Sequence, residues 1–259
     1  NDMEIGGKTG TSETTVPGEV VVSFMGFAPA DDPQILVLLA YNTPARSAEG
    51  SSIGTTGTWI NLLVGFFVGV SSGATVIISQ FFGAGDGKNV SKAVHTSIAL
   101  ALAGGLVIMV LGLLTARPSL VLLGVPEEIL GDALTYMNVY YCGIIASMIY
   151  NVGTGVLRAI GDSRMPLYVL IVCCLVNIVL DLLFVLGFHW DVFGVAIATV
   201  LSQVVSAVLI MARLMLTRES YRVELKRIRF DKSILKNVIR IGLPAGMQSV
   251  LYSVSNLVV

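Results

Sequence analysis

Residues 93–116 read AVHTSIALALAGGLVIMVLGLLTA, a run without aspartate, glutamate, lysine or arginine. A helix needs about 20 apolar residues to cross the hydrocarbon core of a bilayer, and this stretch is long enough. An open sheet of the same residues would leave backbone groups without hydrogen bonds in lipid. The stretch therefore predicts a membrane-spanning helix.

The rest of the chain repeats this pattern. Five long, almost uncharged stretches qualify as spans, and a sixth is just long enough but is cut off at the end of the chain. These six stretches are 59–82, 93–116, 133–157, 167–188, 192–214 and 239–259. Residues 230–239, with Asp231 as a helix N-cap, predict an amphipathic interfacial helix that leads into the last span.

The composition supports a membrane protein. Hydrophobic residues make up 54% of the 259 residues, charged residues only 13%, and the mean hydropathy is +0.82. Soluble domains carry about 25% charged residues. The basic residues form no soluble face with base-stacking aromatics, which argues against nucleic acid as a partner. The expected partner is the lipid bilayer.

The distribution of lysine and arginine among the connectors predicts how the chain is oriented in the membrane. Thirteen of them lie in connectors 83–92, 158–166 and 213–240, against one, Arg117, in the alternate connectors. Cytoplasmic loops carry such an excess. The basic connectors are therefore expected in the cytoplasm, and residues 1–58 are expected outside.

Residues 1–58 differ from the rest of the chain. Three short segments, 4–13, 20–27 and 35–41, predict antiparallel strands, with a turn at 28–33. Residues 42–58 are rich in Gly, Ser and Thr and predict a loop or linker. No secretory signal precedes the first strand, so we expect a fragment cut at its N-terminus.

One carboxylate lies inside a predicted span. Asp181 ends the run VNIVLD, and Asn177 precedes it by four residues, hence on the same helix face. An ionised carboxylate in lipid is costly and usually faces a cavity or a partner. Asp181 can then exchange a proton or help to hold Na⁺, or it can serve as a structural residue bonded to a neighbouring helix.

Other polar residues in the spans have two readings, the lining of a polar cavity or ordinary interhelical hydrogen bonding. They are Tyr136, Asn138, Tyr140, Tyr141, Asn151, Gln203 and Gln248. His95 is expected to be interfacial. The three cysteines, Cys142, Cys173 and Cys174, lack the spacing of a zinc site and are expected to be small packing residues.

Four motifs carry a family resemblance: SQFFGAGD at 79–86, GVLRAIGDSRMP at 155–166, GVAIAT at 194–199 with Gln203, and GLPAGMQ at 242–248. In this order they resemble the MATE multidrug and toxin extrusion transporters, nearest the DinF-like and NorM-like bacterial members. The resemblance covers about 59–259.

The resemblance implies an all-α, multi-pass protein of the bacterial cytoplasmic membrane. The family has twelve helices in two lobes and exchanges H⁺ or Na⁺ for cationic, often aromatic, drugs, without another cofactor. Residues 59–259 would supply helices two to six and the start of helix seven, half of a MATE fold. Asn177, Asp181 and Thr199 would match a cation or proton site. The family's first helix, which carries another key acid, and most of the second lobe have no counterpart, so we do not expect this chain to transport alone.

Residues 1–58 carry a second resemblance. EIGGKTGTSE at 4–13 and FMGFAPA at 24–30 resemble the C-terminal part of a class B penicillin-binding transpeptidase. That resemblance implies that Lys8, Thr9 and Thr11 bind a substrate carboxylate. The nucleophile would come from an upstream Ser-x-x-Lys motif, which does not precede Lys8. Ser233–Lys236 has this spacing but follows Lys8 and lies on the expected cytoplasmic side.

We therefore predict a MATE transporter fragment, and not an enzyme, joined near residues 55–60 to a partial transpeptidase domain. Two alternatives stay open. One is a penicillin-binding D,D-transpeptidase of peptidoglycan synthesis, and the other is a nonfunctional chimera.

Overall fold

The computed structural model describes residues 6–13, 20–28, 35–43, 52–122, 125 and 127–258, with side chains described at 60, 63–122, 125, 127 and 129–251. The chain divides into two compact units, Asn1–Gly54 and Thr55–Val259. Each unit is treated below by itself. The join expected near residues 55–60 stays a prediction.

The first unit holds an antiparallel sheet of three strands in the order β1 (Gly6–Glu13), β2 (Val20–Ala28) and β3 (Ile35–Thr43). Gly7 pairs with Gly26, and Gly26 pairs with Val37. The three predicted strands are confirmed. Most of the predicted turn, residues 44–51 of the linker, and the side chains of Lys8, Thr9 and Thr11 lie outside the described residues.

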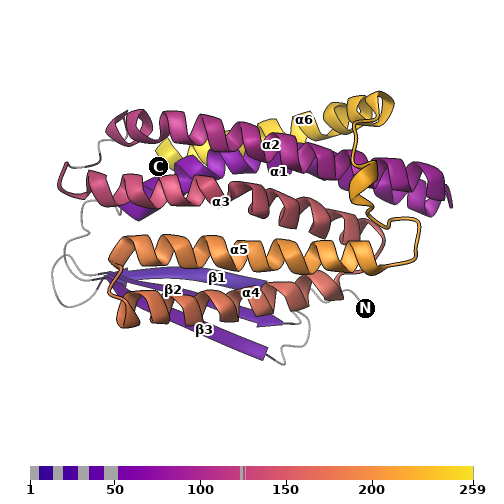
Figure 1. Cartoon of the computed structure of the whole chain (residues 1–259). Coiled ribbons are helices and arrows are strands. Elements are labelled where there is room, and N and C mark those ends of the chain that lie inside the picture. The colour runs from indigo at the N-terminus through magenta and orange to yellow at the C-terminus, as the bar shows by residue number, and fades with distance from the viewer. Residues whose placement is uncertain are drawn as a thin grey trace. The chain divides into compact units, whose positions relative to one another are not determined.

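The second unit consists of long helices (Figure 1). They are α1 (Ser52–Gly83), α2 (Gly87–Leu122), α3 (Glu127–Ala159), α4 (Arg164–Leu182), α5 (Asp191–Leu216) and α6 (Lys232–Val258). Five helical segments of the described chain, within α1 to α5, are long and apolar enough to cross a membrane. The five predicted spans are thus confirmed.

Three boundaries differ from the sequence prediction. First, α1 begins at Ser52, so the second half of the expected linker is helical. Second, the expected span 167–188 changes after Leu182 into a π-helix, η2 (Leu183–Gly187). Third, the interfacial segment and the last span form one continuous helix, α6, which carries Pro244 inside it. Hydropathy reports where apolar residues lie and is insensitive to the backbone hydrogen bonds that set these boundaries.

The turns at the basic end have specific chemistry. Gly85 takes a φ of 72°, a left-handed conformation that glycine adopts without steric cost. Asp86 then caps α2, because its Oδ1 accepts the backbone N–H of Asn89 at 3.1 Å and its Oδ2 accepts the Asn89 side-chain amide at 2.7 Å. These bonds from Asn89 lower the pKa of Asp86. Asp231 is the predicted cap of α6, and its Oδ1 accepts the N–H groups of Ser233 and Ile234.

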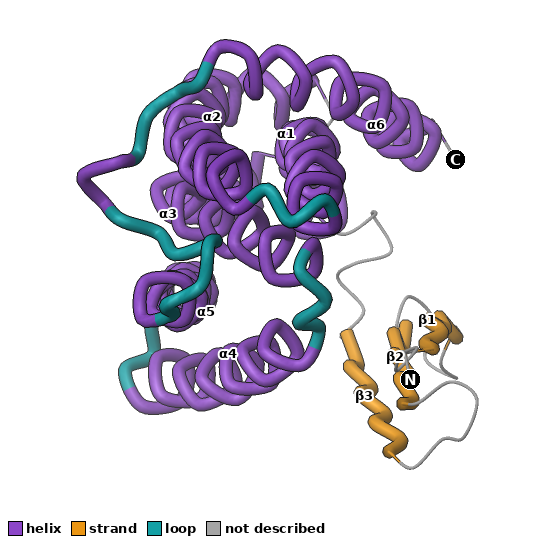
Figure 2. Tube along the Cα trace, turned by 90° about the vertical axis from the view of Figure 1, so that its right-hand side faces the viewer, coloured by secondary structure: helices purple, strands orange, loops and turns teal. Residues whose placement is uncertain are grey.

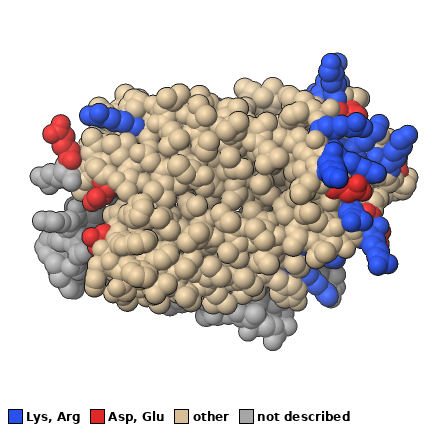
Figure 3. All heavy atoms as spheres, viewed as in Figure 1, with Lys and Arg blue, Asp and Glu red and all other residues tan. Residues whose placement is uncertain are grey.

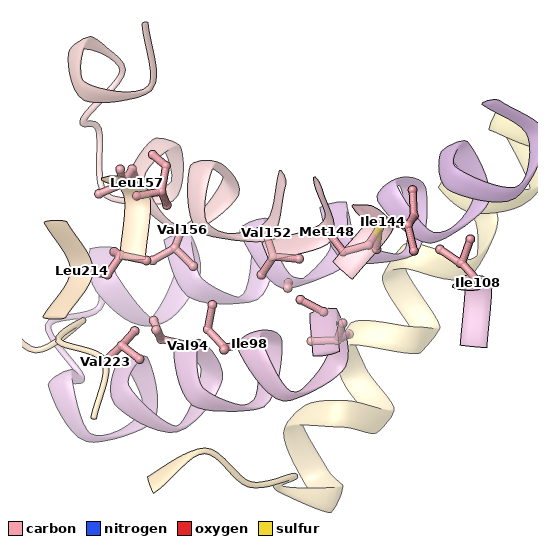
Figure 4. Close-up of a cluster of buried hydrophobic side chains, with 14 of the residues drawn as sticks. Val94, Ile98, Ile108, Ile144, Met148, Val152, Val156, Leu157, Leu214 and Val223 are labelled. Carbon is pink, nitrogen blue, oxygen red and sulfur yellow. The ribbon is translucent and has the colours of Figure 1, made fainter. Parts of the chain in front are cut away.

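The core lies mainly between α2, α3 and α5. Val94 and Ile98 of α2 face Met148, Val152 and Val156 of α3 in one apolar seam (Figure 4). The outward faces carry many exposed leucines and valines, which suits a lipid environment. α4 is the extreme case, since only 6% of its apolar window is buried. Most of the surface of α4 is therefore free to contact lipid or another part of a larger protein.

Glycines bring α1 and α6 together. Gly69 and Gly73 of α1 have the small-xxx-small spacing, and Gly242 and Gly246 of α6 repeat it. A Cβ added at Gly69 would lie 2.6 Å from the Cα of Gly246, and one at Gly73 would lie 2.6 Å from the N of Gly242. The two backbones are therefore in direct contact, and no larger residue fits between them.

We expect Gly69→Ala to destabilise the protein by about 1–3 kcal/mol, because the new methyl group meets backbone that cannot move aside cheaply. Gly83→Ala is the matched control in the same helix, since a Cβ there meets nothing within 4 Å. Thermal unfolding of the two purified variants in detergent measures the difference. Equal melting temperatures would show that the α1–α6 crossing is loose.

Candidate functional site

The distribution of charged side chains distinguishes the two ends of the bundle. Lysines and arginines gather at one end of the visible face, an uncharged band covers the middle, and one basic side chain lies at the other end (Figure 3). At the basic end Arg213 pairs with Asp162 at 3.8 Å and so ties the end of α5 to the turn before α4. The positive-inside rule predicts that this end faces the cytoplasm.

Asn177 and Asp181 lie on α4, and Thr199 lies on the antiparallel helix α5. The thiol of Cys173 donates to the carbonyl oxygen of Ser202 at 3.3 Å, which fixes the register between these helices. One turn further along α4 corresponds to about one turn back along α5, so Asn177 lies at the depth of Thr199. Asp181 lies one turn closer to the outer end, about 26 Å along the axis from Arg164.

Helix α3 runs parallel to α5 and brings tyrosines to the same depth. Gly143 packs against Val200, and Gly153 packs against Ile210, so the two helices stay in register. By this register Tyr136 and Tyr140 lie on either side of the depth of Asp181. Their rings stack with centroids 6.2 Å apart. Figure 2 shows α5 between α3 and α4.

Five side-chain atoms are buried without a hydrogen-bond partner among the described residues: Tyr141 Oη, Thr154 Oγ1, Asn177 Nδ2, Asp181 Oδ1 and Gln203 Oε1. An unpaired buried polar group costs about 1–3 kcal/mol. Thr199 differs, because its hydroxyl donates to the carbonyl oxygen of Val195 at 2.9 Å and keeps its lone pairs free. Asn177 and Thr199 are the members within about one turn of Asp181, while Gln203 lies about two turns from it by the same register.

The remaining predicted residues do not join this group. The amide of Asn151 donates to the Ser147 carbonyl oxygen at 2.8 Å within its own helix. Asn138 and Gln248 are exposed. The ring of Tyr141 is buried against Gly112 of α2. Asn151 therefore bonds within its own helix, whereas the hydroxyl of Tyr141 is buried without a hydrogen-bond partner among the described residues.

His95 is buried within the protein, with 3% of its surface exposed, and its expected position at the membrane interface stays a prediction. Its Nδ1 donates to the Ser91 carbonyl oxygen at 2.7 Å, and its Nε2 accepts the backbone N–H of Glu224 at 3.0 Å. A carbonyl oxygen can only accept, so these partners select the Nδ1–H tautomer. The α5–α6 connector covers His95, and the sequence holds no sign of this contact.

The sequence also did not reveal the π-helix. It begins two residues after Asp181, and such segments are frequent at functional sites. The chain then turns at His189 with a φ of 57°. Trp190 stacks on Phe184 with ring centroids 5.3 Å apart and so closes the outer end of the α4–α5 hairpin.

No group of three or more His, Cys, Asp or Glu side chains is close enough to hold a metal ion within the described part of the chain. Asp181 therefore does not belong to such a cluster there.

Comparison with known proteins identifies the bundle. The MatE family profile matches residues 37–183, more than half of the chain. The chain belongs to the MatE family. This is a family of multidrug efflux transporters, and the predicted family resemblance is confirmed.

Similar curated MatE proteins are bacterial. The probable multidrug resistance protein YoeA of Bacillus subtilis is 28% identical over 205 residues, which are 76% of this chain and 44% of YoeA. The probable multidrug resistance protein NorM of Thermotoga maritima is 27% identical, over 80% of this chain and 45% of NorM. The chain thus spans less than half the length of these two relatives.

Solved MATE structures have the same fold. A multidrug resistance MATE family transporter in an inward-facing conformation superposes with a TM-score of 0.72 at 27% identity, over 78% of this chain and 46% of that one. A MATE structure in the bent conformation gives the same TM-score over 80% of this chain and 48% of that one. These neighbours are transporters and not enzymes.

The profile of the penicillin-binding protein transpeptidase domain matches residues 1–57. That range overlaps the MatE match over residues 37–57. The multidrug export protein MepA of Staphylococcus aureus, 24% identical, aligns over 96% of this chain and so extends into the stranded unit. The matches therefore do not locate a join between two proteins.

If the unpaired amide of Gln203 is kept for function, its removal should not destabilise the fold. We expect Gln203→Met to melt at the same temperature as the parent or higher, because it removes a buried acceptor that has no partner. Asn151→Leu is the comparison, and it should melt lower because it deletes a 2.8 Å hydrogen bond. A clear loss of stability in Gln203→Met would show that this amide is structural.

Proposed function

We propose that this chain forms one lobe of an antiporter that exchanges H⁺ or Na⁺ for small cationic or aromatic drug-like molecules across the cell membrane. The observation that carries the proposal is the buried, unpaired Oδ1 of Asp181, one helical turn from the unpaired amide of Asn177. The relatives named for multidrug resistance support the substrate class. The charge bias supports an orientation with the basic connectors inside and residues 1–58 outside.

Asp181 has two ways to couple transport. It can bind a proton on Oδ1, which removes its charge from the lipid-embedded site. It can also hold Na⁺ together with the Thr199 hydroxyl and the Asn177 side chain, whose amide can turn its oxygen inward. Both uses neutralise a carboxylate that is costly to leave charged and unpaired.

The stacked Tyr136 and Tyr140 give the site an aromatic wall. Aromatic faces attract organic cations. A cationic substrate near these rings would compete with H⁺ or Na⁺ for the charge of Asp181. If the substrate and the coupling ion compete for one carboxylate, the site cannot hold both at once. The movement of one across the membrane then excludes the simultaneous movement of the other.

Transport by alternating access needs two bundles that rock about a central site. The chain covers about 45% of the length of the relatives and structures to which it was compared. The proposed activity therefore belongs to a two-lobe transporter in which this bundle provides the first lobe and Asp181 the coupling group.

In a two-lobe transporter that carries this bundle, we expect Asp181→Asn to reduce drug efflux driven by a proton or sodium gradient at least tenfold, because the amide cannot ionise. Asp132→Asn is the matched control, an exposed acid on α3. Efflux of a fluorescent cation from proteoliposomes, under each imposed gradient, measures the effect. Gradient-driven efflux that persists in Asp181→Asn would make Asp181 a structural residue.

The transpeptidase match at residues 1–57 supports a second candidate function, acyl transfer in peptidoglycan synthesis. Lys8, Thr9 and Thr11 would bind the substrate carboxylate in that case. No Ser-x-x-Lys motif precedes them in this sequence. Whether this unit still binds the carboxylate of a β-lactam without reacting is a separate question from catalysis.

We expect no covalent labelling of the purified chain by a fluorescent penicillin, because the acylated serine is missing. Denaturing gel electrophoresis with in-gel fluorescence measures it, with an intact penicillin-binding protein as the positive control. A labelled band that disappears in Ser233→Ala would assign the nucleophile to Ser233 and restore the enzyme reading.

A further inference from the structure

A second polar site lies at the basic end, far along the helices from Asp181. A cavity of about 440 Å³ opens between the start of α2 and the α5–α6 connector. Its lining consists of Lys88, Ser91, Lys92, His95, Thr96, Lys226, Arg227, Arg229 and Asp231. Five of these residues are basic and one is acidic, so the cavity is built for an anion.

The basic side chains are only partly neutralised. Lys92 lies 3.8 Å from Asp231, and Arg227 lies 3.0 Å from Glu224. Lys88, Lys226 and Arg229 have no ion pair within 4.0 Å among the described residues. A cavity with three uncompensated cations attracts a negatively charged group strongly.

The wall of the cavity is fixed by hydrogen bonds from α2. Thr96 Oγ1 donates to the Arg229 carbonyl oxygen at 3.4 Å and accepts the Asp231 backbone N–H at 3.2 Å. His95 accepts the N–H of Glu224. Beneath these bonds Val223 is buried against the core. The connector that carries Lys226, Arg227 and Arg229 is thus held in place over α2.

The depth of the cavity matches the headgroup region of a bilayer. Residues 98–116 of α2 are uncharged and span about 28 Å as a helix, close to the thickness of the hydrocarbon core. The lining residues Lys88–Thr96 precede this segment. They therefore lie at the level of lipid phosphates on the cytoplasmic side.

Apolar side chains beside the cavity favour a lipid over a free anion. Leu225 and Phe230 are 60% and 46% exposed on the same connector as the basic residues. Their apolar surface suits the acyl chains of a lipid, while the neighbouring cations suit the phosphate of its headgroup. A soluble phosphate would use only the cations.

We propose that this cavity binds the phosphate headgroup of an anionic phospholipid of the cytoplasmic leaflet. Lys88, Lys226 and Arg229 supply the charge, and Leu225 and Phe230 contact the acyl chains. The site is independent of the transport activity proposed above and of Asp181.

The test is a lipid titration of the full chain in a neutral detergent, followed by native mass spectrometry, with phosphatidylglycerol as the probe and phosphatidylcholine as the neutral comparison. We expect phosphatidylglycerol to bind selectively. Each lysine or arginine near a membrane surface contributes about fivefold in affinity. The double variant Lys226→Gln/Arg229→Gln should therefore lose roughly 25-fold.

Matched variants separate the cavity from general surface charge. Arg218→Gln/Lys236→Gln removes two exposed charges from the same end outside the cavity, and it should change the affinity less than twofold. Lys226→Arg/Arg229→Lys keeps both charges in the cavity and should retain binding. Circular dichroism of each variant verifies the fold.

Three results would overturn the proposal. Equal binding of the two lipids by the parent chain excludes an anion site, and this comparison needs no variant. Equal losses in the two double glutamine variants would assign binding to general surface charge. Displacement of phosphatidylglycerol by millimolar inorganic phosphate would show that a free anion, and not a lipid, is the ligand.

Discussion

Lipid tails are as apolar as leucine, so burial of apolar surface does not by itself hold membrane helices together. Close packing between helix backbones does hold them together, and in this bundle glycines at the helix–helix interfaces make that packing possible. Gly69 meets Gly246 between α1 and α6, Gly112 receives the ring of Tyr141 between α2 and α3, and Gly143 receives Val200 between α3 and α5. Each of these interfaces also fixes the depth of one helix against the next.

The site depends on these fixed depths. Because α3 and α5 are held in register, Tyr136 and Tyr140 reach the depth at which α4 presents Asp181. Helix α4 itself has little support from packing inside the chain. The Cys173–Ser202 hydrogen bond and the Asp162–Arg213 ion pair hold it at two levels. Among the five described spans, the helix that carries Asp181 is thus the one least buried in the core.

The sequence predicted well what depends on one helix at a time. Span positions follow from hydropathy, and the cap Asp231 follows from local chemistry, so both were accessible. The hydrogen-bond and packing partners of individual side chains were not accessible, because they depend on which helix faces meet in the fold. Nothing in the sequence shows that Asn151 bonds its own helix or that Tyr141 packs on Gly112 while Gln203 has no partner. The π-helix after Asp181 was likewise hidden, since a change of hydrogen-bond register leaves hydropathy unchanged.

The buried polar side chains of the bundle fall into two groups. At the basic end the buried His95 has a partner for each ring nitrogen, and the hydroxyl of Thr96 both donates and accepts. These are structural polar groups, and their hydrogen bonds are complete. Asn177, Asp181 and Gln203 each have a buried atom without a hydrogen-bond partner among the described residues, as do the hydroxyls of Tyr141 and Thr154. Asp181 is the carboxylate of this second group. Since an unpaired carboxylate in a membrane span is a lasting cost to stability, its presence supports the proposal that an ion or substrate binds there and leaves again.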